Sequence, residues 1–465
     1  MTKQNVKNLT QAACMTFLLL LLLCLAGCKS GEQGQNNGDD KAAAMGTNQA
    51  QSKDEESEEN KKSEADKKNS KESYDDLTML NSNHENYCDT GYYFLEEDEH
   101  QKIKYIDYET RQEIYLCNKP NCKHDNQDCS AYVDDSCQLY VYKDSIYLVS
   151  SWGEVYTASI DEEGELSQGT EKKAPVIYRM NLDGTGKEKI FELPAGMEIA
   201  PQVISGKYLY AFFRKSESVQ MGSNSYTSVE KEKNLSVINL ETGKWEKLMD
   251  GKNKNIVGVY KGNLIMTETI YQKDPDEFLN DDEGWLENLK NSDISMTLYS
   301  LENKKEEKIV QVNYDKMQEI ICDGKFVYFL RDNSSAIDCL DLETKKVRTV
   351  KELQRERASL VDGKEGNILY LYYDQNSNEG QVKEAYVVNA KTGESKEFTL
   401  LDEDRTYAGC IAENNEYYLV ITGYDMTDYY KTWAGTMQRD IERVKYGLIT
   451  KENYWNSVAD YIEIK

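Results

Sequence analysis

Hydrophobic and polar residues alternate in short runs along most of this chain, and compact polar turns separate the runs. In Ile177–Leu193 alternating residues lead to Asp183-Gly184, and a second strand-like run follows. Asp-Gly between such runs predicts a β-hairpin, because glycine accepts positive φ and aspartate hydrogen-bonds to its own backbone. The segment therefore predicts two antiparallel strands joined by a tight turn.

The same phrase recurs with variations. Copies lie in Leu235–Leu248 and Ala385–Phe398, and in Cys339–Val350 another residue replaces the turn glycine. A second phrase alternates with the first: a short turn, then a strand rich in Tyr, Val, Ile and Phe, as in Ile321–Leu330. Together they make a four-stranded module that repeats about every 40–60 residues, a period typical of propellers and other arrays.

The modules predict an all-β fold, a β-propeller of seven blades with mostly four antiparallel strands. One module cannot bury both faces of its sheet, whereas a closed ring buries the faces and protects the edges. The first module lacks a clear set of four strands, so six or eight blades stay open, and a pair of β-sandwiches is the alternative fold. We expect modules to start near Tyr87, Cys137, Ala200, Ile256, Gln318, Ala358 and Gly409.

Residues 1–27 are a predicted signal peptide. Lys3 and Lys7 precede the apolar run Phe17–Ala26, which is short for a transmembrane helix. The run leads into Leu25-Ala26-Gly27-Cys28, which resembles the lipobox of bacterial lipoproteins. That resemblance implies cleavage before Cys28 and lipid on this cysteine, and therefore a lipid anchor on the extracytoplasmic face of the cell membrane. An ordinary signal peptide with a chance cysteine is the alternative.

Residues 28–73 predict a disordered polar tether that begins at the lipidated Cys28. Gly, Asn, Gln and Ser give way to a mixed-charge run with almost no large apolar residue, so the segment cannot bury enough apolar surface to fold. Residues 74–465 are ample for one propeller. A cysteine-rich loop at 117–137 and rim insertions at 274–294 and 429–444 interrupt its repeat.

The charge balance limits the classes of partner that the chain is expected to bind. The chain has 83 acidic and 56 basic residues, a formal net charge of −27. This acidity argues against nucleic acid and against direct adhesion to anionic lipid. We therefore expect a monomer that is attached to the membrane through lipid on Cys28. Calcium is a minor hypothesis at Asp281-Asp282-Glu283, because these residues lack the EF-hand spacing.

Five cysteines crowd the early part of the predicted ring, with a histidine among them. Three cysteines and one histidine are a ligand set for structural zinc, but the spacing C-x4-C-x-H-x4-C differs from the paired C-x2-C of common zinc sites. Thiols outside the cytoplasm tend to oxidise, so disulfides are the leading hypothesis, zinc the second, and unpaired or mixed thiols the third. No cofactor is otherwise predicted. The cluster comprises Cys88, Cys117, Cys122, His124, Cys129 and Cys137.

No catalytic residue is predicted. The three histidines lie far from any motif that suggests a triad, and no G-x-S-x-G, H-E-x-x-H or phosphate loop occurs. Carboxylates are so abundant that the sequence does not single out a glycosidase pair. The rim insertions supply the candidate ligand contacts Trp285, Tyr429 and Trp433, with the covering of a strand edge as their alternative role.

The phrase YRMNLDGTGKEKI, with its aromatic partner strand, resembles the TolB-like and domain-of-unknown-function β-propeller lipoproteins of gut Firmicutes. The segment LCNKPNCKHDNQDC resembles a cysteine-rich insert that accompanies some of them. The resemblance covers residues 87–465 and implies a surface-anchored propeller of uncharacterised role. The expected function is a binding or scaffold module for a protein, peptide or glycan ligand. The alternatives are a carbohydrate-active lyase or hydrolase with an acidic central pocket, and an accessory or sensory subunit of a transporter or signalling system.

Overall fold

The computed structural model divides the chain into two units, residues 1–70 and 71–465, and the described residues all belong to the second. The predicted signal peptide, Cys28 and the whole of the predicted tether (28–73) lie outside them. No helix among the described residues is long and apolar enough to span a membrane. The structure describes residues 76–80, 86–97, 100–133, 136–160, 166–220, 226–279, 281–332, 334–354, 358–373, 382–401, 407–427, 430–431, 437–438 and 441–465.

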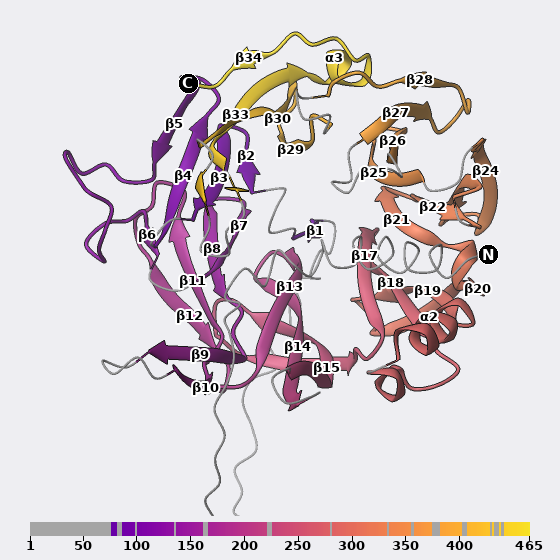
Figure 1. The fold of residues 1–465 in the computed structure, drawn as a ribbon, viewed down its shortest axis with the longest axis horizontal. Coiled ribbons are helices and arrows are strands. Elements are labelled where there is room, and N and C mark those ends of the chain that lie inside the picture. Colours follow the sequence, from indigo (N-terminus) through magenta and orange to yellow (C-terminus); the bar gives the residue numbers. More distant parts are fainter. Residues whose placement is uncertain are drawn as a thin grey trace, which may run out of the picture. The chain divides into compact units, whose positions relative to one another are not determined.

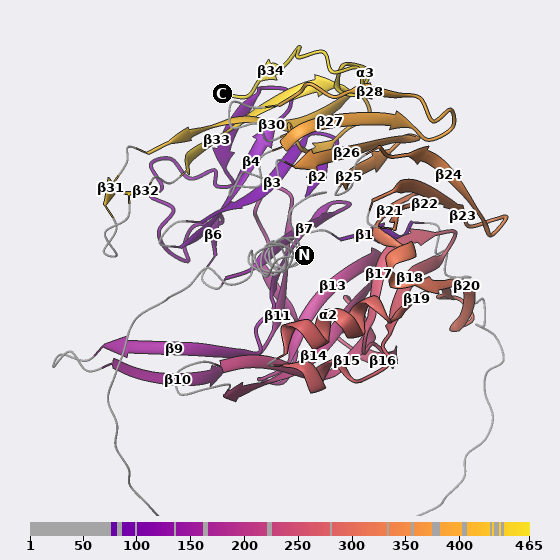
Figure 2. The same ribbon diagram turned by 45° about the vertical axis from the view of Figure 1, so that its right-hand side comes forward.

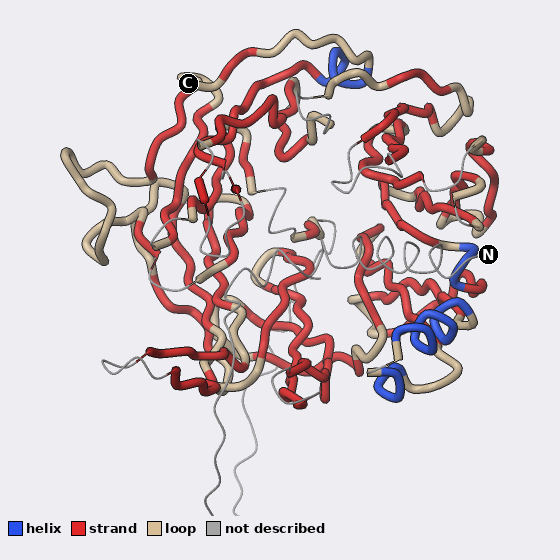
Figure 3. Tube along the Cα trace, in the orientation of Figure 1, coloured by secondary structure: helices blue, strands red, loops and turns tan. Residues whose placement is uncertain are grey.

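Within the second unit, seven antiparallel sheets form a ring, which confirms the predicted seven-bladed propeller (Figure 1). The first strand of each blade lies nearest the axis and the fourth lies at the outer rim. Strands dominate the described residues, and helices are restricted to a few short segments (Figure 3). The first strands begin close to the positions that the repeated phrases predict.

The blades are built as follows. Blade 1 has β2 (Tyr87–Cys88), β3 (Gly91–Glu96), β4 (Gln101–Asp107) and β5 (Gln112–Tyr115), with β6 (Tyr132–Val133) also on β4; blade 2 has β7 (Gln138–Tyr142), β8 (Ser145–Ser150), β11 (Val176–Asn181) and β12 (Glu188–Glu192). Blade 3 has β13 (Glu198–Ser205), β14 (Tyr208–Gln220), β15 (Tyr226–Asn239) and β16 (Trp245–Asp250); blade 4 has β17 (Lys254–Tyr260), β18 (Asn263–Ile270), β19 (Asp293–Ser300) and β20 (Lys305–Asn313).

Blade 5 has β21 (Gln318–Asp323), β22 (Phe326–Arg331), β23 (Ala336–Asp341) and β24 (Lys346–Glu352); blade 6 has β25 (Ala358–Lys364), β26 (Asn367–Tyr373), β27 (Val382–Asn389) and β28 (Ser395–Glu397); blade 7 has β29 (Cys410–Glu413), β30 (Tyr417–Met426), β33 (Ile441–Thr450) and β34 (Ile462–Glu463). Outside the blade order lie β1 (Thr78–Met79), the pairs β9 (Glu154–Ile160) with β10 (Leu166–Lys172) and β31 (Tyr430–Lys431) with β32 (Met437–Gln438), and the helices η1 (Pro275–Phe278), α2 (Asp282–Lys290), η2 (Tyr314–Lys316) and α3 (Lys451–Trp455).

The repeated turn phrase produces the same backbone geometry in several blades. In blade 6 the Asn389 side chain accepts hydrogen bonds from the N–H groups of Lys391 and Thr392, both at 3.0 Å, and Gly393 has φ of 73°. In blade 5, where the glycine is replaced, Lys345 takes the same position with φ of 56°. The polar residue at the start of the turn therefore sets its shape, and glycine only lowers the cost of the left-handed residue.

Buried apolar side chains fill the spaces between adjacent blades. Between blades 2 and 3, for example, Val149 and Ile177 pack in one cluster with Phe213 and Ile238, and all four are at most 1% exposed. Burying one such side chain contributes about 2 kcal/mol. A single blade could not bury these faces, so the ring is the unit of stability.

The chain ends of the second unit lie on different parts of the ring. Strand β1 pairs with β13, the first strand of blade 3, and so lies inside the ring (Figure 1). At the other end, the Lys465 N–H donates to the Arg111 carbonyl at 2.8 Å, and the Glu113 N–H donates to the Lys465 carbonyl at 3.1 Å. The C-terminal residue therefore joins blade 7 to the outer strand of blade 1.

Candidate metal centre and the elaborated face of the ring

The outer strand of blade 1 is split into two pieces by the cysteine-rich loop. Strand β5 pairs with residues 104–107 of β4, and β6 pairs with residues 101–102. Between them, the Ile103 carbonyl accepts from the Leu116 N–H at 3.0 Å, and its N–H donates to the Ala131 carbonyl at 2.8 Å. The loop therefore leaves and rejoins the sheet at one point, and its body extends outside the ring (Figure 1).

Four side chains converge at the base of this loop. One ligand atom each from Cys117, Cys122, His124 and Cys129 lies within 4.8 Å of all the others. Cys129 is only 4% exposed, and the other three are half-buried. Three sulfurs and one imidazole nitrogen in such a group form a set that could bind a metal ion.

Local backbone structure places these ligands. The Cys122 N–H donates to the Lys119 carbonyl at 3.3 Å, and the Cys129 N–H donates to the Asn126 carbonyl at 3.0 Å, so a turn precedes each cysteine. His124 has φ of 56°, a left-handed conformation that costs a non-glycine residue about 1–2 kcal/mol. The contacts of its ring offset that cost: Nδ1 lies 3.1 Å from the Cys129 sulfur.

Tyr115 supports the histidine from outside the ligand set. Its ring stacks on His124 with the centroids 4.4 Å apart, and its hydroxyl donates to Glu96 at 2.8 Å. Glu96 in turn forms an ion pair of 2.5 Å with Lys104, whose ammonium group also pairs with Glu113 at 2.6 Å. The ring of His124 is thus oriented by a side chain that is itself hydrogen-bonded, as is common around metal ligands.

The sulfurs differ in their affinity for protons. Burial raises the pKa of the Cys117 thiol, but the backbone N–H of Lys119 and the neighbouring thiols outweigh burial and bring the pKa below its ordinary value. Burial and the neighbouring thiols raise the pKa of Cys129 to about 12. Cys117 therefore loses its proton more readily than Cys129, and a positive charge between the sulfurs would favour deprotonation of both.

The donor set fits a tetrahedral thiophilic ion. At a zinc–sulfur distance of about 2.3 Å, tetrahedral sulfurs lie about 3.8 Å apart, so the present spacing needs only a small contraction. Thiolate and imidazole are ligands that zinc prefers over calcium or magnesium. The residues present therefore fit the zinc hypothesis, although their spacing along the chain is not that of a common zinc motif.

The structure separates the six residues that the sequence grouped together. Cys88 lies on β2 with its sulfur 3.2 Å from the Thr90 hydroxyl, and Cys137 is buried beside β7, where its N–H donates to Gln101 at 2.7 Å. Neither is among the four converging residues. No disulfide occurs in the part of the chain that the structure describes, and the disulfide hypothesis stays a prediction about the oxidised protein.

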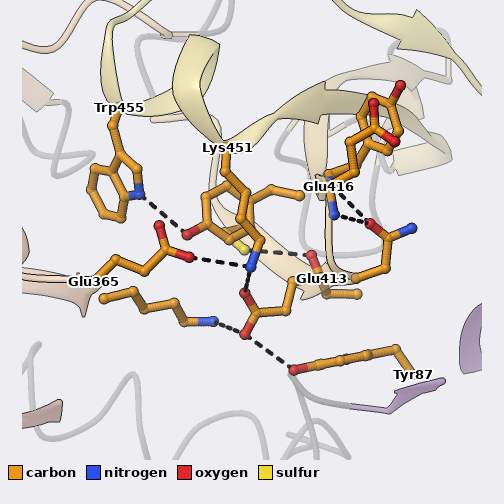
Figure 4. A network of polar contacts seen from close by, with 12 residues as sticks. Tyr87, Glu365, Glu413, Glu416, Lys451 and Trp455 are labelled. Carbon is orange, nitrogen blue, oxygen red and sulfur yellow. Dashed lines mark hydrogen bonds and ion pairs between the residues drawn. The ribbon is translucent and has the colours of Figure 1, made fainter. Parts of the chain in front are cut away.

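A second polar cluster lies beside the first strands of blades 6, 7 and 1, and Figure 4 shows its centre at Glu413. This carboxylate accepts from Lys451 at 2.9 Å and from the Tyr87 hydroxyl at 3.3 Å, and it lies 3.5 Å from the Lys364 ammonium. Lys451 also pairs with Glu365 at 3.3 Å. The Glu413 network therefore links blade 6, blade 7 and blade 1.

The charges of this network compensate one another. Burial raises the pKa of Glu413, but the two lysines outweigh burial and hold that pKa below its ordinary value. The pKa of the nearby Asp362 is raised, because burial and the charges of Glu413 and Asp323 oppose its ionisation more strongly than Lys364 favours it. Carboxylates thus gather here, but among the described residues they do not form a metal-ligand group.

The connections between strands differ sharply between the two faces of the ring. Because neighbouring strands are antiparallel, the connections from second to third strand all reach one face, and the turns from first to second strand reach the other. The second-to-third connections contain the hairpin β9–β10, the long extension of β14 and β15, the helices η1 and α2, and the pair β31–β32. Figure 2 shows β9–β10 and β31–β32 extending from the same side of the ring. We call this side the elaborated face.

The predicted rim residues are only partly described. Trp285 lies on α2 and is half-buried, whereas Tyr429 and Trp433 lie outside the described residues. Of the acidic residues considered for calcium, Asp281 caps α2 by accepting from the Gly284 N–H at 2.9 Å, and Asp282 and Glu283 occupy the first turn. Acidic side chains at a helix N-terminus are explained by the helix dipole, without an ion.

Sequence reasoning missed the Glu413 network and the C-terminal contact of Lys465 with blade 1. Glu413, Lys364 and Lys451 occur in a chain with many charged residues, and no spacing rule distinguishes them. Their one shared signal is position, because Lys364 and Glu413 each end the first strand of a module. Which blades lie next to each other at the closure of the ring becomes known only from the fold.

Comparison with known proteins assigns no family to the chain. No protein-family model matches the chain, and no curated protein matches it. A puromycin-hydrolyzing peptidase from Mycobacterium tuberculosis is similar in structure with a TM-score of 0.44 and 10% identity, over 84% of this chain and 53% of the peptidase, so the chain spans about half of that protein.

Two further structures are similar at comparable distance. TolB from Acinetobacter baumannii matches with a TM-score of 0.32 and 12% identity, over 80% of this chain and 78% of TolB. An oligogalacturonate lyase in complex with manganese matches with a TM-score of 0.34 and 13% identity, over 65% and 84% of the two chains. At these levels of similarity the matches carry no argument about activity.

Proposed function

We propose that this chain is an extracytoplasmic, membrane-anchored lipoprotein whose β-propeller is a binding or scaffold module for a protein, peptide or glycan ligand. The observation that carries the binding role is the elaborated face, where the long connections of several blades gather while the first-to-second turns of the other face stay short. Loops held by a rigid scaffold are where binding residues concentrate. The anchor rests on the lipobox-like sequence that ends in Cys28.

The test of the anchor is the Cys28→Ala variant, expressed with its own leader. We expect the native chain to partition with membranes and to incorporate labelled fatty acid, and the variant to lose both properties. A variant that stays membrane-bound with an unchanged leader would refute lipid anchoring through Cys28, whatever the propeller binds.

The binding face is tested by exchanging connections. The hairpin at 151–175 and the insertion at 271–292 are each replaced by a short turn, and the variants are compared with the native chain in capture of cell-surface proteins and glycans. We expect capture to fall while the circular dichroism of the ring is retained. A matched change, replacement of the short first-to-second turn Gly206-Lys207 on the opposite face by Asn-Gly, should leave capture intact. Equal capture by all variants would contradict the proposal.

The carbohydrate-active enzyme remains the second candidate, because Asp323, Asp362 and Glu413 come from the first strands of three consecutive blades and interact electrostatically. Shortening of a captured glycan, abolished by Asp362→Asn, would favour it. Retention of the glycan unchanged would favour the binding module.

We further propose that Cys117, Cys122, His124 and Cys129 hold one structural zinc ion. Four protein ligands leave no position open on a tetrahedral ion, which is the arrangement of structural rather than catalytic zinc. Support comes from the convergence of the four ligand atoms and from the oriented ring of His124. When bound, the ion would neutralise the thiolates and join both ends of the loop.

The zinc proposal is tested by metal analysis of the purified chain. We expect one zinc per chain, and in Co²⁺-substituted protein the charge-transfer absorption of sulfur ligands. Cys122→Ser should lower both, whereas Cys88→Ser should change neither, because Cys88 lies outside the group. A chain that contains no zinc, and whose clustered cysteines are joined by disulfides in the mass spectrum of the unreduced protein, would establish the disulfide hypothesis instead.

A further inference from the structure

The three sulfurs of the cysteine cluster lie close enough to react with one another. The ligand atoms of Cys117, Cys122, His124 and Cys129 are all within 4.8 Å of each other, and none of the three cysteines is in a disulfide. Because a disulfide joins two sulfurs at about 2 Å, a pair of them needs to approach by about 3 Å at most. The group that can hold a metal ion can therefore also form a disulfide, and a sulfur used in the disulfide is lost as a metal ligand.

The three cysteines differ in their access from solvent. Cys117 and Cys122 are half-buried, whereas Cys129 is only 4% exposed. The Cys129 sulfur also lies 3.1 Å from Nδ1 of His124, whose ring is stacked on Tyr115. Cys117 and Cys122 are therefore the pair that a reagent in solution reaches first.

The backbone between Cys117 and Cys122 already folds back on itself. The Cys122 N–H donates to the Lys119 carbonyl at 3.3 Å, and Asn121 has φ of 57°. Four residues separate Cys117 from Cys122, whereas six separate Cys122 from Cys129. Because a shorter loop costs less chain entropy to close, a disulfide between Cys117 and Cys122 is favoured by chain length as well as by access.

We propose that the cysteine cluster is a redox switch, in which a small-molecule disulfide joins Cys117 to Cys122 and thereby releases the zinc ion. The inference rests on the proposed zinc site and assigns regulation to it. It also rests on the proposed extracytoplasmic location, because disulfides form and persist in such oxidising surroundings. Zinc and the disulfide then belong to two states of one cluster.

The exchange of thiols and disulfides balances without a further reactant. Coordination to zinc keeps the sulfurs as thiolates, and a thiolate that leaves the ion attacks one sulfur of the external disulfide. The resulting mixed disulfide is then attacked by the second cysteine. Two electrons pass from the cysteine pair to the external disulfide, which leaves as two thiolates that take up protons from water. Zinc departs because Cys129 and His124 are the two ligands that remain.

Oxidation would change the outer edge of blade 1. Strand β5 and Cys117 belong to the first half of its split outer strand, and Cys129 and β6 belong to the second half. Bound zinc would join the two halves, whereas a disulfide between Cys117 and Cys122 lies wholly in the first part of the loop. We therefore expect residues 130–133 to open more often in the oxidised chain than in the zinc-loaded chain.

The test uses oxidised glutathione as the external disulfide. The full chain is reduced with a phosphine, and its zinc content is measured after loading and before the oxidant is added. Zinc release is followed with a chromogenic chelator, and disulfides are mapped by mass spectrometry without reduction. We expect one zinc to leave per chain, a disulfide between Cys117 and Cys122, and faster hydrogen exchange at residues 130–133 but not in β8 of blade 2. Treatment with the phosphine should restore zinc binding.

Single cysteine variants separate the pair from its neighbours. In Cys117→Ser the second step has no favoured partner, so we expect glutathione to stay attached to Cys122. In Cys129→Ser the pair is intact, and the same disulfide should form as in the native chain. Cys88→Ser is the matched control, because Cys88 lies outside the cluster, and it should release zinc at the native rate.

The outcomes distinguish failure of the switch from failure of the zinc site. A reduced chain that binds no zinc would overturn both. A chain that binds zinc but keeps it in oxidised glutathione, with its cysteines still reduced, would overturn the switch and leave the zinc site standing. A disulfide that joins Cys129 to either of the other two cysteines in the native chain would overturn the assignment of the pair.

Discussion

Two polar regions involve blade 1, and they differ in their chemistry. The Glu413 network near the axis compensates its own charges, since a carboxylate lies between two lysines and a tyrosine hydroxyl. The four ligand side chains of the cysteine cluster at the outer rim supply three sulfurs and an imidazole, with no ammonium or guanidinium group. The first region is complete as it stands, whereas the second can bring its thiolates together only around a positive ion. A polar cluster that lacks counter-charges is therefore the better indication of an external ligand.

The largest effect on stability should come from changes to the cysteine cluster. Removal of one ligand by Cys129→Ser, or of the ion by a chelator, should lower the free energy of unfolding by about 4 kcal/mol at a zinc concentration 1,000 times the dissociation constant. Thermal unfolding with and without chelator measures this loss. A chelator should not affect Cys129→Ser, and if the native chain were equally unaffected, the cluster would not depend on metal.

Mutation of the Glu413 network should lower the free energy of unfolding by less. Glu413→Ala leaves the half-buried Lys364 and Lys451 without their shared carboxylate, and we expect a loss of about 2 kcal/mol, reduced from the fully buried case because water reaches the lysines. Denaturant unfolding measures it. Addition of Lys451→Met should recover part of the loss, since the unpaired charge is then gone. Simple additivity of the two changes would show that the pair does not interact.

The two regions also differ in their dependence on pH. The pKa of Glu413 is held below its ordinary value of about 4.5. Its contribution to stability is therefore present above about pH 4.5 and is lost as the pH falls through the folded-state pKa. We expect the melting temperature of Glu413→Gln to fall less steeply below about pH 4.5 than that of the native chain. Thermal unfolding measured from neutral to acidic pH tests this. The exposed Glu397 on β28 provides the control, because Glu397→Gln should follow the native curve.

The smallest effects concern the repeated turns away from both regions. Lys345 adopts a left-handed conformation where other copies have glycine, so Lys345→Gly should stabilise the chain by up to about 1 kcal/mol. At Gly393 a β-carbon would lie 2.7 Å from the Val350 carbonyl oxygen, so Gly393→Ala should destabilise it by about 1–2 kcal/mol. Chemical denaturation compares the two, and effects of the same sign would contradict the shared turn geometry.

The sequence alone determined the ring and the positions of its blades. Turn residues such as Asp183-Gly184 and the alternating runs beside them act locally, so their pattern could be read from neighbouring residues. The sequence also indicated the residues of the cysteine loop, because cysteine and histidine are rare enough for their proximity along the chain to be informative.

Tertiary structure decided which of those residues meet. Cys88 and Cys137 separate from the four converging ligands because they belong to β2 and to the start of β7, whereas the four lie between the two halves of one split strand. The Glu413 network likewise joins blades that are neighbours only after the ring has closed. Local patterns determine strands and turns, but contacts between blade 7 and blade 1 span most of the chain, and no local pattern encodes them.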